Sequence, residues 1–279
     1  MSKTRASFLD WGRVSIVPNP TAEQTKEIPP VVGVTHYGYA RDTDSALAQV
    51  TDADGKQHTE KFLFYRGLGN FSLPVTLTAQ GHDRFELHNT SSSPIPTAFL
   101  IQIDGKDPSS ARLAKFEHVT ANLPMTLPPG KVSQNHLATM LRESLVASGL
   151  YEKEASAMVK TWKDTWLAEP GTRLLYIVPR PVVDSMLPLQ ITPTPADTAR
   201  VLVGRIDILT PENESRLQAM VAAASLTTDL PADDARFLTE LGRFYDPAIE
   251  RAEKLLGDAK SKQSELLWTQ WRRAAAGKK

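Results

Sequence analysis

The chain from residue 14 to about residue 120 carries short runs of apolar and β-branched residues, separated by turn sequences. The clearest runs are Thr35–Arg41 with Tyr37 and Tyr39 on one face, Leu73–Thr78, Arg84–His88 and Thr97–Ile103. Runs of this length and spacing are typical of strands in a sandwich or a partly open barrel. We therefore expect residues 1–125 to form an antiparallel, sandwich-like β-rich domain.

A hairpin is predicted early in this region. Leu47–Val50 and Thr59–Tyr65 flank the turn sequence Asp52–Gly55, and Asp and Gly favour tight turns. The second strand would include four consecutive large apolar residues, Phe62–Tyr65. Because such a run cannot alternate between core and water, we expect it to be buried on both faces near the centre of the β-rich half.

Beyond residue 126 the hydrophobic period changes from two to about 3.6. Ser133 is a good N-cap for a helix that ends near Gly149, and a second amphipathic helix is predicted over Tyr151–Leu167. Two β-like segments follow at Thr172–Val178 and Thr198–Leu209. We expect these two strands to pair with each other or to extend the earlier sheet.

The rest of the chain predicts helices. Thr210 precedes Pro211 and an acidic residue, which is a favourable helix start. Asp246 begins a long amphipathic helix that continues to about Ala275. The predicted fold class is α+β, with a β-sandwich-like amino-terminal half, then a helical hairpin, two strands and a helical carboxy-terminal tail. Residues 126–279 are predicted to be a second, α+β domain with an amphipathic carboxy-terminal helix.

Composition removes several classes of function. The 279 residues include 32 Lys and Arg, 32 Asp and Glu, and no Cys. A chain without net charge has no overall field that attracts nucleic acid or an anionic membrane, so we expect no nucleic-acid partner. The absence of cysteine excludes thiol nucleophiles, disulfides and cysteine-based zinc sites.

Targeting signals are also weak. The first residues contain no apolar run of signal-peptide length, and no segment approaches the roughly 20 apolar residues of a membrane helix. We expect a cytoplasmic protein if the chain is complete as written. It would be extracytoplasmic if it is part of a longer exported protein.

The most specific candidate chemistry is the pair His58-x-Glu60. On a strand these two side chains share one face, so an imidazole and a carboxylate can bind one divalent cation. His36 or His88 would supply a third ligand or a general base. The alternative interpretation places His58 and Glu60 on the wet rim of the sheet, hydrogen-bonded to a neighbour or to water.

The residues leave two functional hypotheses. No Gly-x-Ser-x-Gly, GxxxxGK[ST], GxGxxG or HExxH sequence is present. The leading hypothesis is therefore a non-enzymatic binding or assembly module with no favoured cofactor, which contacts itself or a protein partner through the carboxy-terminal helix. The second is a metal-dependent hydrolase or lyase with its His/Glu site on the β-rich half.

Three segments carry a resemblance. EKFLFYRG (Glu60–Gly67), TRLLYIVPR (Thr172–Arg180) and RVLVGRIDILTP (Arg200–Pro211) resemble sequences in large uncharacterised proteins of environmental bacteria. The resemblance extends from about Val31 to Tyr245. It implies no reaction and no site residue. The similar proteins look longer and exported, which implies that this chain is the carboxy-terminal portion of a larger protein.

Overall fold

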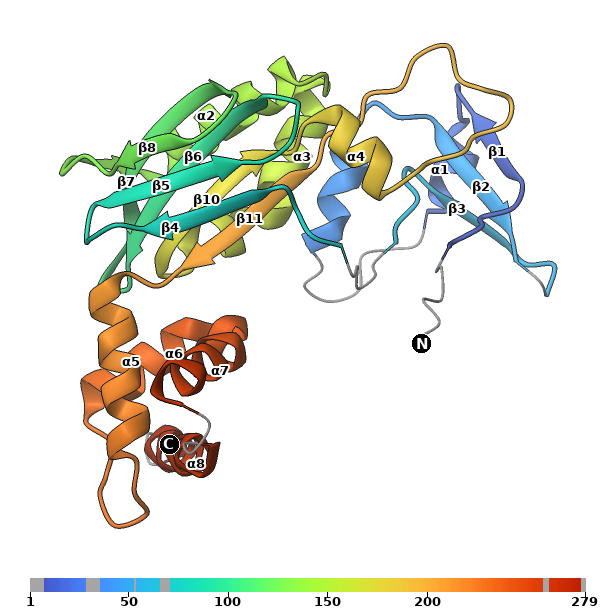
Figure 1. The fold of residues 1–279 in the computed structure, drawn as a ribbon. Helices are drawn as coiled ribbons and strands as arrows, with labels where there is room; N and C mark the ends of the chain where they lie inside the picture. Colours follow the sequence, from blue (N-terminus) through green and yellow to red (C-terminus); the bar gives the residue numbers. More distant parts are fainter. Residues whose placement is uncertain (1–7, 29–35, 53, 66–70, 258–260, 277–279) are drawn as a thin grey trace, which may run out of the picture. The chain divides into compact units, whose positions relative to one another are not determined.

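The computed structural model describes residues 8–28, 36–52, 54–65, 71–257 and 261–276. The chain forms two compact units. The first unit comprises Met1–Asn70 with Tyr151–Trp162, and the second comprises Phe71–Leu150 with Lys163–Lys279. Antiparallel sheets dominate the amino-terminal half, helices and two further strands follow, and the carboxy-terminal region is helical, which confirms the α+β class (Figure 1).

The first unit is built on a small antiparallel sheet. Its elements are β1 (Val14–Val17), α1 (Ala22–Lys26), η1 (His36–Asp42), β2 (Leu47–Thr51), β3 (Gln57–Glu60) and most of α3 (Glu152–Lys163). The strand order is β1-β2-β3. The predicted hairpin is confirmed, because β2 pairs with β3 around a turn in which Gly55 has a φ of +78°.

Two predictions for this unit are wrong. The strand β3 ends at Glu60, and Leu63, Phe64 and Tyr65 are 40%, 49% and 56% exposed rather than buried on both faces. In the described part of this unit, no second sheet packs over the three short strands to bury four consecutive large residues. The segment predicted as a strand at Thr35–Arg41 contains instead the 3₁₀ helix η1.

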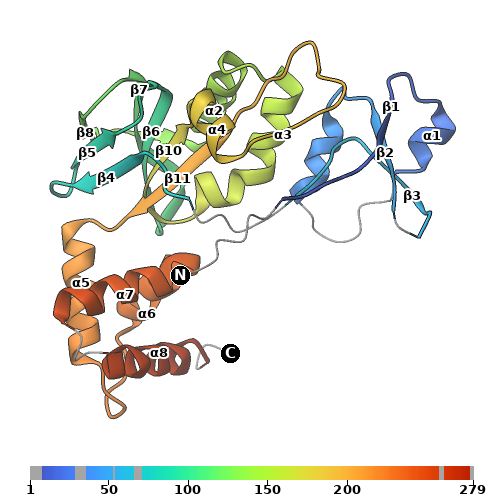
Figure 2. The same ribbon diagram turned by 45° about the vertical axis from the view of Figure 1, so that its right-hand side comes forward.

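The second unit contains two facing antiparallel sheets (Figures 1 and 2). One sheet has the order β11-β10-β6-β7-β9 and the other has the order β4-β5-β8. The strands are β4 (Val75–Ala79), β5 (Arg84–Asn89), β6 (Ile95–Asp104), β7 (Asp107–Val119), β8 (Leu123–Thr126), β9 (Lys131–Ser133), β10 (Gly171–Ile177) and β11 (Val203–Ile208). The prediction was that the two late strands pair with each other or extend the earlier sheet. Both occur, because β10 lies between β11 and β6.

The core of the second unit lies between these sheets. Phe85, Leu87 and Met125 from the three-stranded sheet form one buried cluster with Leu100 and Leu174 from the five-stranded sheet. Strand β6 is buried from Thr97 to Ile101, and its residues Ala98 and Leu100 belong to the cluster between the sheets. The five-stranded sheet thus joins strands from both sides of residue 125.

Three helical segments accompany the sheets. They are α2 (Gln134–Ala147), the π-helix η2 (Asp164–Ala168) and α4 (Arg180–Met186). Ser133 caps α2 as predicted, since its side chain accepts a hydrogen bond from the His136 amide. The chain leaves α2 through Gly149, whose φ of +109° favours glycine.

The end of the second unit is a helical cluster (Figure 2). It consists of α5 (Pro211–Ala223), α6 (Ala232–Leu241), the 3₁₀ turn η3 (Gly242–Phe244), α7 (Tyr245–Leu256) and α8 (Ser261–Ala276). Thr210 caps α5 as predicted. The single terminal helix is corrected to two helices, because Gly257 ends α7 with a φ of +87°.

Part of the apolar face of the terminal helix α8 packs inside this cluster. Leu267 is fully buried, and the Trp271 ring stacks on Tyr245 at 4.8 Å. Trp268 is 44% exposed, with the Arg272 guanidinium 4.7 Å from its ring centroid. Among the described residues, the chain has no helix long and apolar enough to cross a membrane.

Candidate functional site

His58 and Glu60, the candidate metal ligands predicted from the sequence, lie on one face of the small sheet. The β1-β2-β3 register aligns Val14 with Val50 and His58, and it aligns Ile16 with Ala48 and Glu60. Paired residues in adjacent strands point to the same side, and so do residues two apart along one strand. His58 and Glu60 therefore border an apolar floor that includes Ala48 and Val50.

The opposite face of the sheet is covered. Leu47 is fully buried there, and Thr59 is 5% exposed. The Thr59 hydroxyl donates to the carboxylate of Glu27 at 2.9 Å, and the Gln49 amide donates to the same oxygen at 3.3 Å. Since Glu27 follows α1 directly, these bonds attach α1 to that face. The face with His58 and Glu60 is the one left for a ligand.

An open groove of about 440 Å³ lies on the face with His58 and Glu60. We call it the aromatic groove. Its lining residues are Trp11, Tyr37, Ala48, Val50, His58, Glu60, Phe62, Leu63 and Phe64. Phe62, Leu63 and Phe64, which follow β3, supply three of these side chains. This apolar run therefore lines a groove instead of filling a core. The groove therefore has an apolar floor and several aromatic walls.

The aromatic walls are held by ring contacts within the same unit. Tyr37 lies 4.3 Å from Phe64 between ring centroids, and its other neighbour is Trp162 of α3 at 6.4 Å in an edge-on arrangement. Trp11 meets Tyr65 edge-on at 5.7 Å. Such tilted and edge-on pairs are favourable geometries for aromatic rings. The rings are thus positioned before any ligand arrives.

The carboxylate at the groove is already engaged. The Nε of Arg41 donates to both oxygens of Glu60 at 2.9 and 3.0 Å, and its Nη2 donates at 2.5 Å. Both side chains are 24% exposed. Lys61 reinforces this arrangement because its ammonium group donates to the carbonyls of Arg41 and Thr43. Glu60 therefore fixes η1 against β3.

The imidazole at the groove is engaged as well. His58 Nε2 lies 2.8 Å from the Asp52 carboxylate. The other Asp52 oxygen accepts hydrogen bonds from the amides of Asp54 and Lys56, which close the hairpin turn. The hydrogen bond from His58 and the Lys56 amide hold the pKa of Asp52 below its ordinary value. His58 thus helps to hold Asp52 in the turn of its own hairpin.

The structure brings together only part of the predicted metal set. His58 and Glu60 both line the groove, whereas His88 belongs to β5 of the second unit, where its Nε2 lies 3.7 Å from Glu86. The side chain of His36 lies outside the described part of the structure. Among the side chains that are described, no group of three His, Asp or Glu residues is placed to hold a metal ion.

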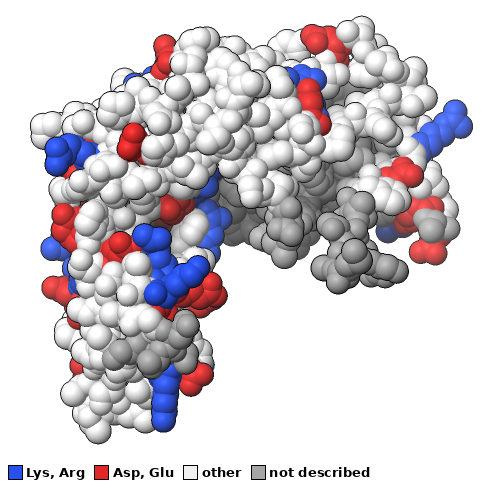
Figure 3. All heavy atoms as spheres, viewed as in Figure 1, with Lys and Arg blue, Asp and Glu red and all other residues white. Residues whose placement is uncertain are grey.

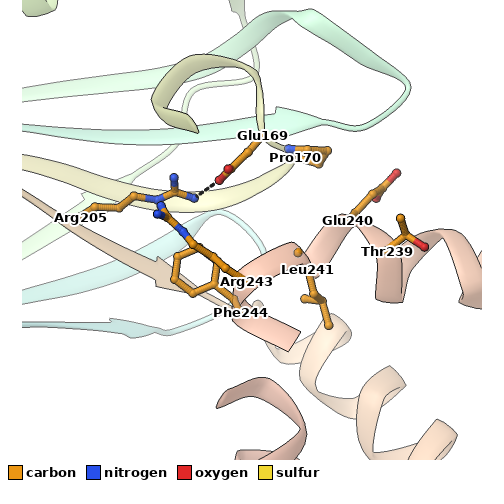
Figure 4. A pocket seen from close by; sticks show the side chains of 9 residues that line it. Glu169, Pro170, Arg205, Thr239, Glu240, Leu241, Arg243 and Phe244 are labelled. Carbon is orange, nitrogen blue, oxygen red and sulfur yellow. Dashed lines mark ion pairs between the residues drawn. The ribbon is translucent and has the colours of Figure 1, made fainter. Parts of the chain in front are cut away.

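A second cavity, of about 300 Å³, lies in the second unit between β11 and the helical cluster (Figure 4). Arg205 and Glu169 point toward each other across one wall, at 2.7 Å. Arg205 also binds Asp207 at 2.6 Å. Burial disfavours its charge, but the bonds with Asp207 and Glu169 prevail and raise its pKa above the ordinary value. Phe244 covers the guanidinium, 5.0 Å from its ring centroid.

Arg173 lies beside this cavity and is fully buried. Its guanidinium donates to the carbonyls of Thr165 and Pro170 at 2.9 and 2.7 Å, and also to that of Glu169. Burial and the nearby Arg205 lower its pKa to about 10. These bonds satisfy carbonyls at the end of η2. The charges around this cavity thus connect the sheet to η2 and the helices, so we regard it as structural.

Neither the comparisons nor the charge distribution adds another site. No family model, curated protein or solved structure matches the chain. On the face shown in Figure 3, basic and acidic side chains are interspersed over the helical cluster. The aromatic groove is therefore the candidate site that the residues themselves support best.

Proposed function

We propose that this protein is a non-enzymatic binding or assembly module, and that its aromatic groove binds an uncharged, extended, proline-rich peptide. The observation that carries the proposal is the composition of the groove. Trp11, Tyr37, Phe62 and Phe64 stand over a floor of Ala48 and Val50. Aromatic-lined grooves are the usual docking surfaces for proline-rich segments, whose extended conformation exists before binding and loses little entropy.

The polar groups of the groove favour an uncharged ligand. Glu60 is neutralised by Arg41, and His58 is paired with Asp52. A charged ligand would have to compete with these pairs and lose its own hydration. An apolar peptide would instead gain from covering the exposed side chains of Leu63 and Phe64, which are 40% and 49% exposed.

Peptide binding tests the proposal directly. A fluorescently labelled, uncharged peptide of alternating proline and leucine is titrated with the full chain, and its anisotropy is followed. We expect saturable binding that Phe64→Ala weakens by about tenfold or more, because aromatic side chains in a groove carry much of the binding energy.

Phe71→Ala is the matched control. Phe71 is 45% exposed, close to the 49% of Phe64, but it belongs to the second unit and does not line the groove. We expect this variant to bind the peptide like the wild type. The proposal is contradicted if the wild type does not bind the peptide, or if both variants lose the same affinity.

A further inference from the structure

A long exposed segment connects α4 to β11 in the second unit (Figures 1 and 2). All ten residues from Pro188 to Asp197 are exposed, and none of them belongs to a helix or a strand. We call residues 187–197 the proline arm. Leu189 and Ile191 are 46% and 48% exposed, so two large apolar side chains face water on it.

The base of the proline arm is pinned by charged side chains. The Asp184 carboxylate, in α4, accepts hydrogen bonds from Arg180 Nε and from Arg200 Nη1, each at 2.7 Å. Arg200 also donates to the carbonyl of Leu187, and Arg180 donates to the carbonyl of Thr198. Both ends of the arm are therefore fixed to the same small cluster, which presents the segment between them.

The chemistry of the arm matches the ligand that the groove favours. Its sequence from Leu187 to Ala196, LPLQITPTPA, contains three prolines and no charged residue, and Asp197 at the end of the arm is its one charged residue. The arm, which includes a cis Thr192–Pro193 peptide bond, belongs to no helix or strand, so its side chains are not committed to a sheet or a core. Fixing the ends of the arm lowers the entropy lost on binding.

We infer that the proline arm of one copy binds in the aromatic groove of a second copy of this chain. Leu189 and Ile191 are the anchors that enter the groove, over Val50 and against the Phe64 ring. The inference rests on the proposed function, because it names the partner of the same groove. An arm and a groove are different surfaces, so the contact is heterologous and joins copies head to tail into a ring or an open chain.

Mixing two defective variants tests this inference sharply. The variant Leu189→Asp with Ile191→Asp has a damaged arm and an intact groove, whereas Phe64→Ala has an intact arm and a damaged groove. We expect sedimentation velocity to show concentration-dependent association of the wild type and a monomer for each variant alone. An equimolar mixture of the two variants should form a one-to-one complex that grows no further.

Trp268→Asp is the control for a different exposed aromatic side chain, on α8. We expect it to associate like the wild type. The inference is overturned if the wild type is monomeric at every concentration, if the arm variant still associates, if the mixture forms no complex, or if Trp268→Asp abolishes association. If any of these occurs while the labelled peptide still binds in a Phe64-dependent way, the proposed function stands and only the choice of partner is wrong.

Discussion

Arg41 holds the Glu60 carboxylate through three hydrogen bonds of 2.5 to 3.0 Å. The pair spans 19 residues of sequence and ties η1 to β3, on the border of the aromatic groove. The Glu60 carboxylate, which the sequence predicted as a metal ligand, therefore anchors η1 to β3. Tyr37 lies on the same 3₁₀ helix, so the pair also fixes one wall of the groove.

A double-mutant cycle measures this pair. We expect Arg41→Met and Glu60→Gln each to destabilise the protein, and the two changes together to cost less than their sum by about 1 kcal/mol, because the pair is partly buried and bidentate. Urea unfolding of the four proteins gives the coupling free energy. Strictly additive costs would show that Arg41 and Glu60 do not stabilise each other.

Phe64 and Leu47 should respond very differently to truncation, although both belong to the first unit. Leu47 is fully buried, so Leu47→Ala should cost about 2 to 5 kcal/mol of unfolding free energy. Phe64 is 49% exposed, so Phe64→Ala should cost about 1 kcal/mol or less. Urea unfolding compares the two variants. A cost for Phe64→Ala as large as that for Leu47→Ala would mean that Phe64 is a core residue.

Gly204 lies opposite Tyr176 in the pairing of β11 with β10, and the Tyr176 ring covers it. A Cβ atom on Gly204 would lie 2.5 Å from ring atoms of Tyr176. Because Tyr176 is 1% exposed and has no room to move away, Gly204→Ala should cost about 1 to 3 kcal/mol.

The control for this glycine is the same substitution beside a smaller partner. In a Tyr176→Leu background, Gly204→Ala should cost clearly less, since the ring that it meets is gone. Thermal or urea unfolding of the four proteins tests this. An equal cost in both backgrounds would contradict the steric explanation.

The base of the proline arm should depend on the charge of Asp184. Hydrogen bonds from Arg180 and then Arg200 lower the pKa of this carboxyl below its ordinary value of 3.8. A group whose pKa is lower in the folded state stabilises it above the unfolded pKa, and that contribution is lost as the pH falls through the folded pKa. The arm should therefore stay pinned at neutral pH and loosen only below pH 3.8.

Asp184→Asn reproduces the neutral side chain at neutral pH. We expect thermolysin, which cuts before large apolar residues, to cleave this variant at Leu189 or Ile191 faster than the wild type. Asp197→Asn is the control on the same arm, because the Asp197 carboxylate accepts a hydrogen bond from the neighbouring Thr198 amide at 2.7 Å and its replacement leaves the bonds of Asp184 in place. Equal cleavage rates for wild type and Asp184→Asn would show that the charged cluster does not restrain the arm.

Local signals predicted the elements of this fold well. Ser133 and Thr210 are N-caps with good first turns, and each begins a helix where it was expected. The apolar segments before and after the proline-rich stretch form the paired strands β10 and β11. The cap interactions lie within a few residues of one another, so the sequence reports them directly, whereas the strands were recognised from their own apolar composition.

The groove was harder to predict because its character depends on what lies across from each residue. Phe62 to Tyr65 have the composition of a buried strand, but in the described part of the first unit no second sheet packs over them, and they form a surface instead. The partners of His58 and Glu60 also come from outside the strand, through Asp52 and Arg41. Sequence patterns indicated which residues matter there, but not with which residues they pair.

The signal of the Trp11 indole tests the central claim most directly. Trp11 is the tryptophan that lines the aromatic groove, whereas Trp268 and Trp271 belong to α8. In ¹⁵N-labelled protein titrated with the uncharged proline–leucine peptide, we expect the Trp11 indole N–H resonance to shift and saturate while those of Trp268 and Trp271 stay in place. An unchanged Trp11 resonance at saturating peptide, or equal shifts of all three, would contradict the assignment of the groove as the binding site.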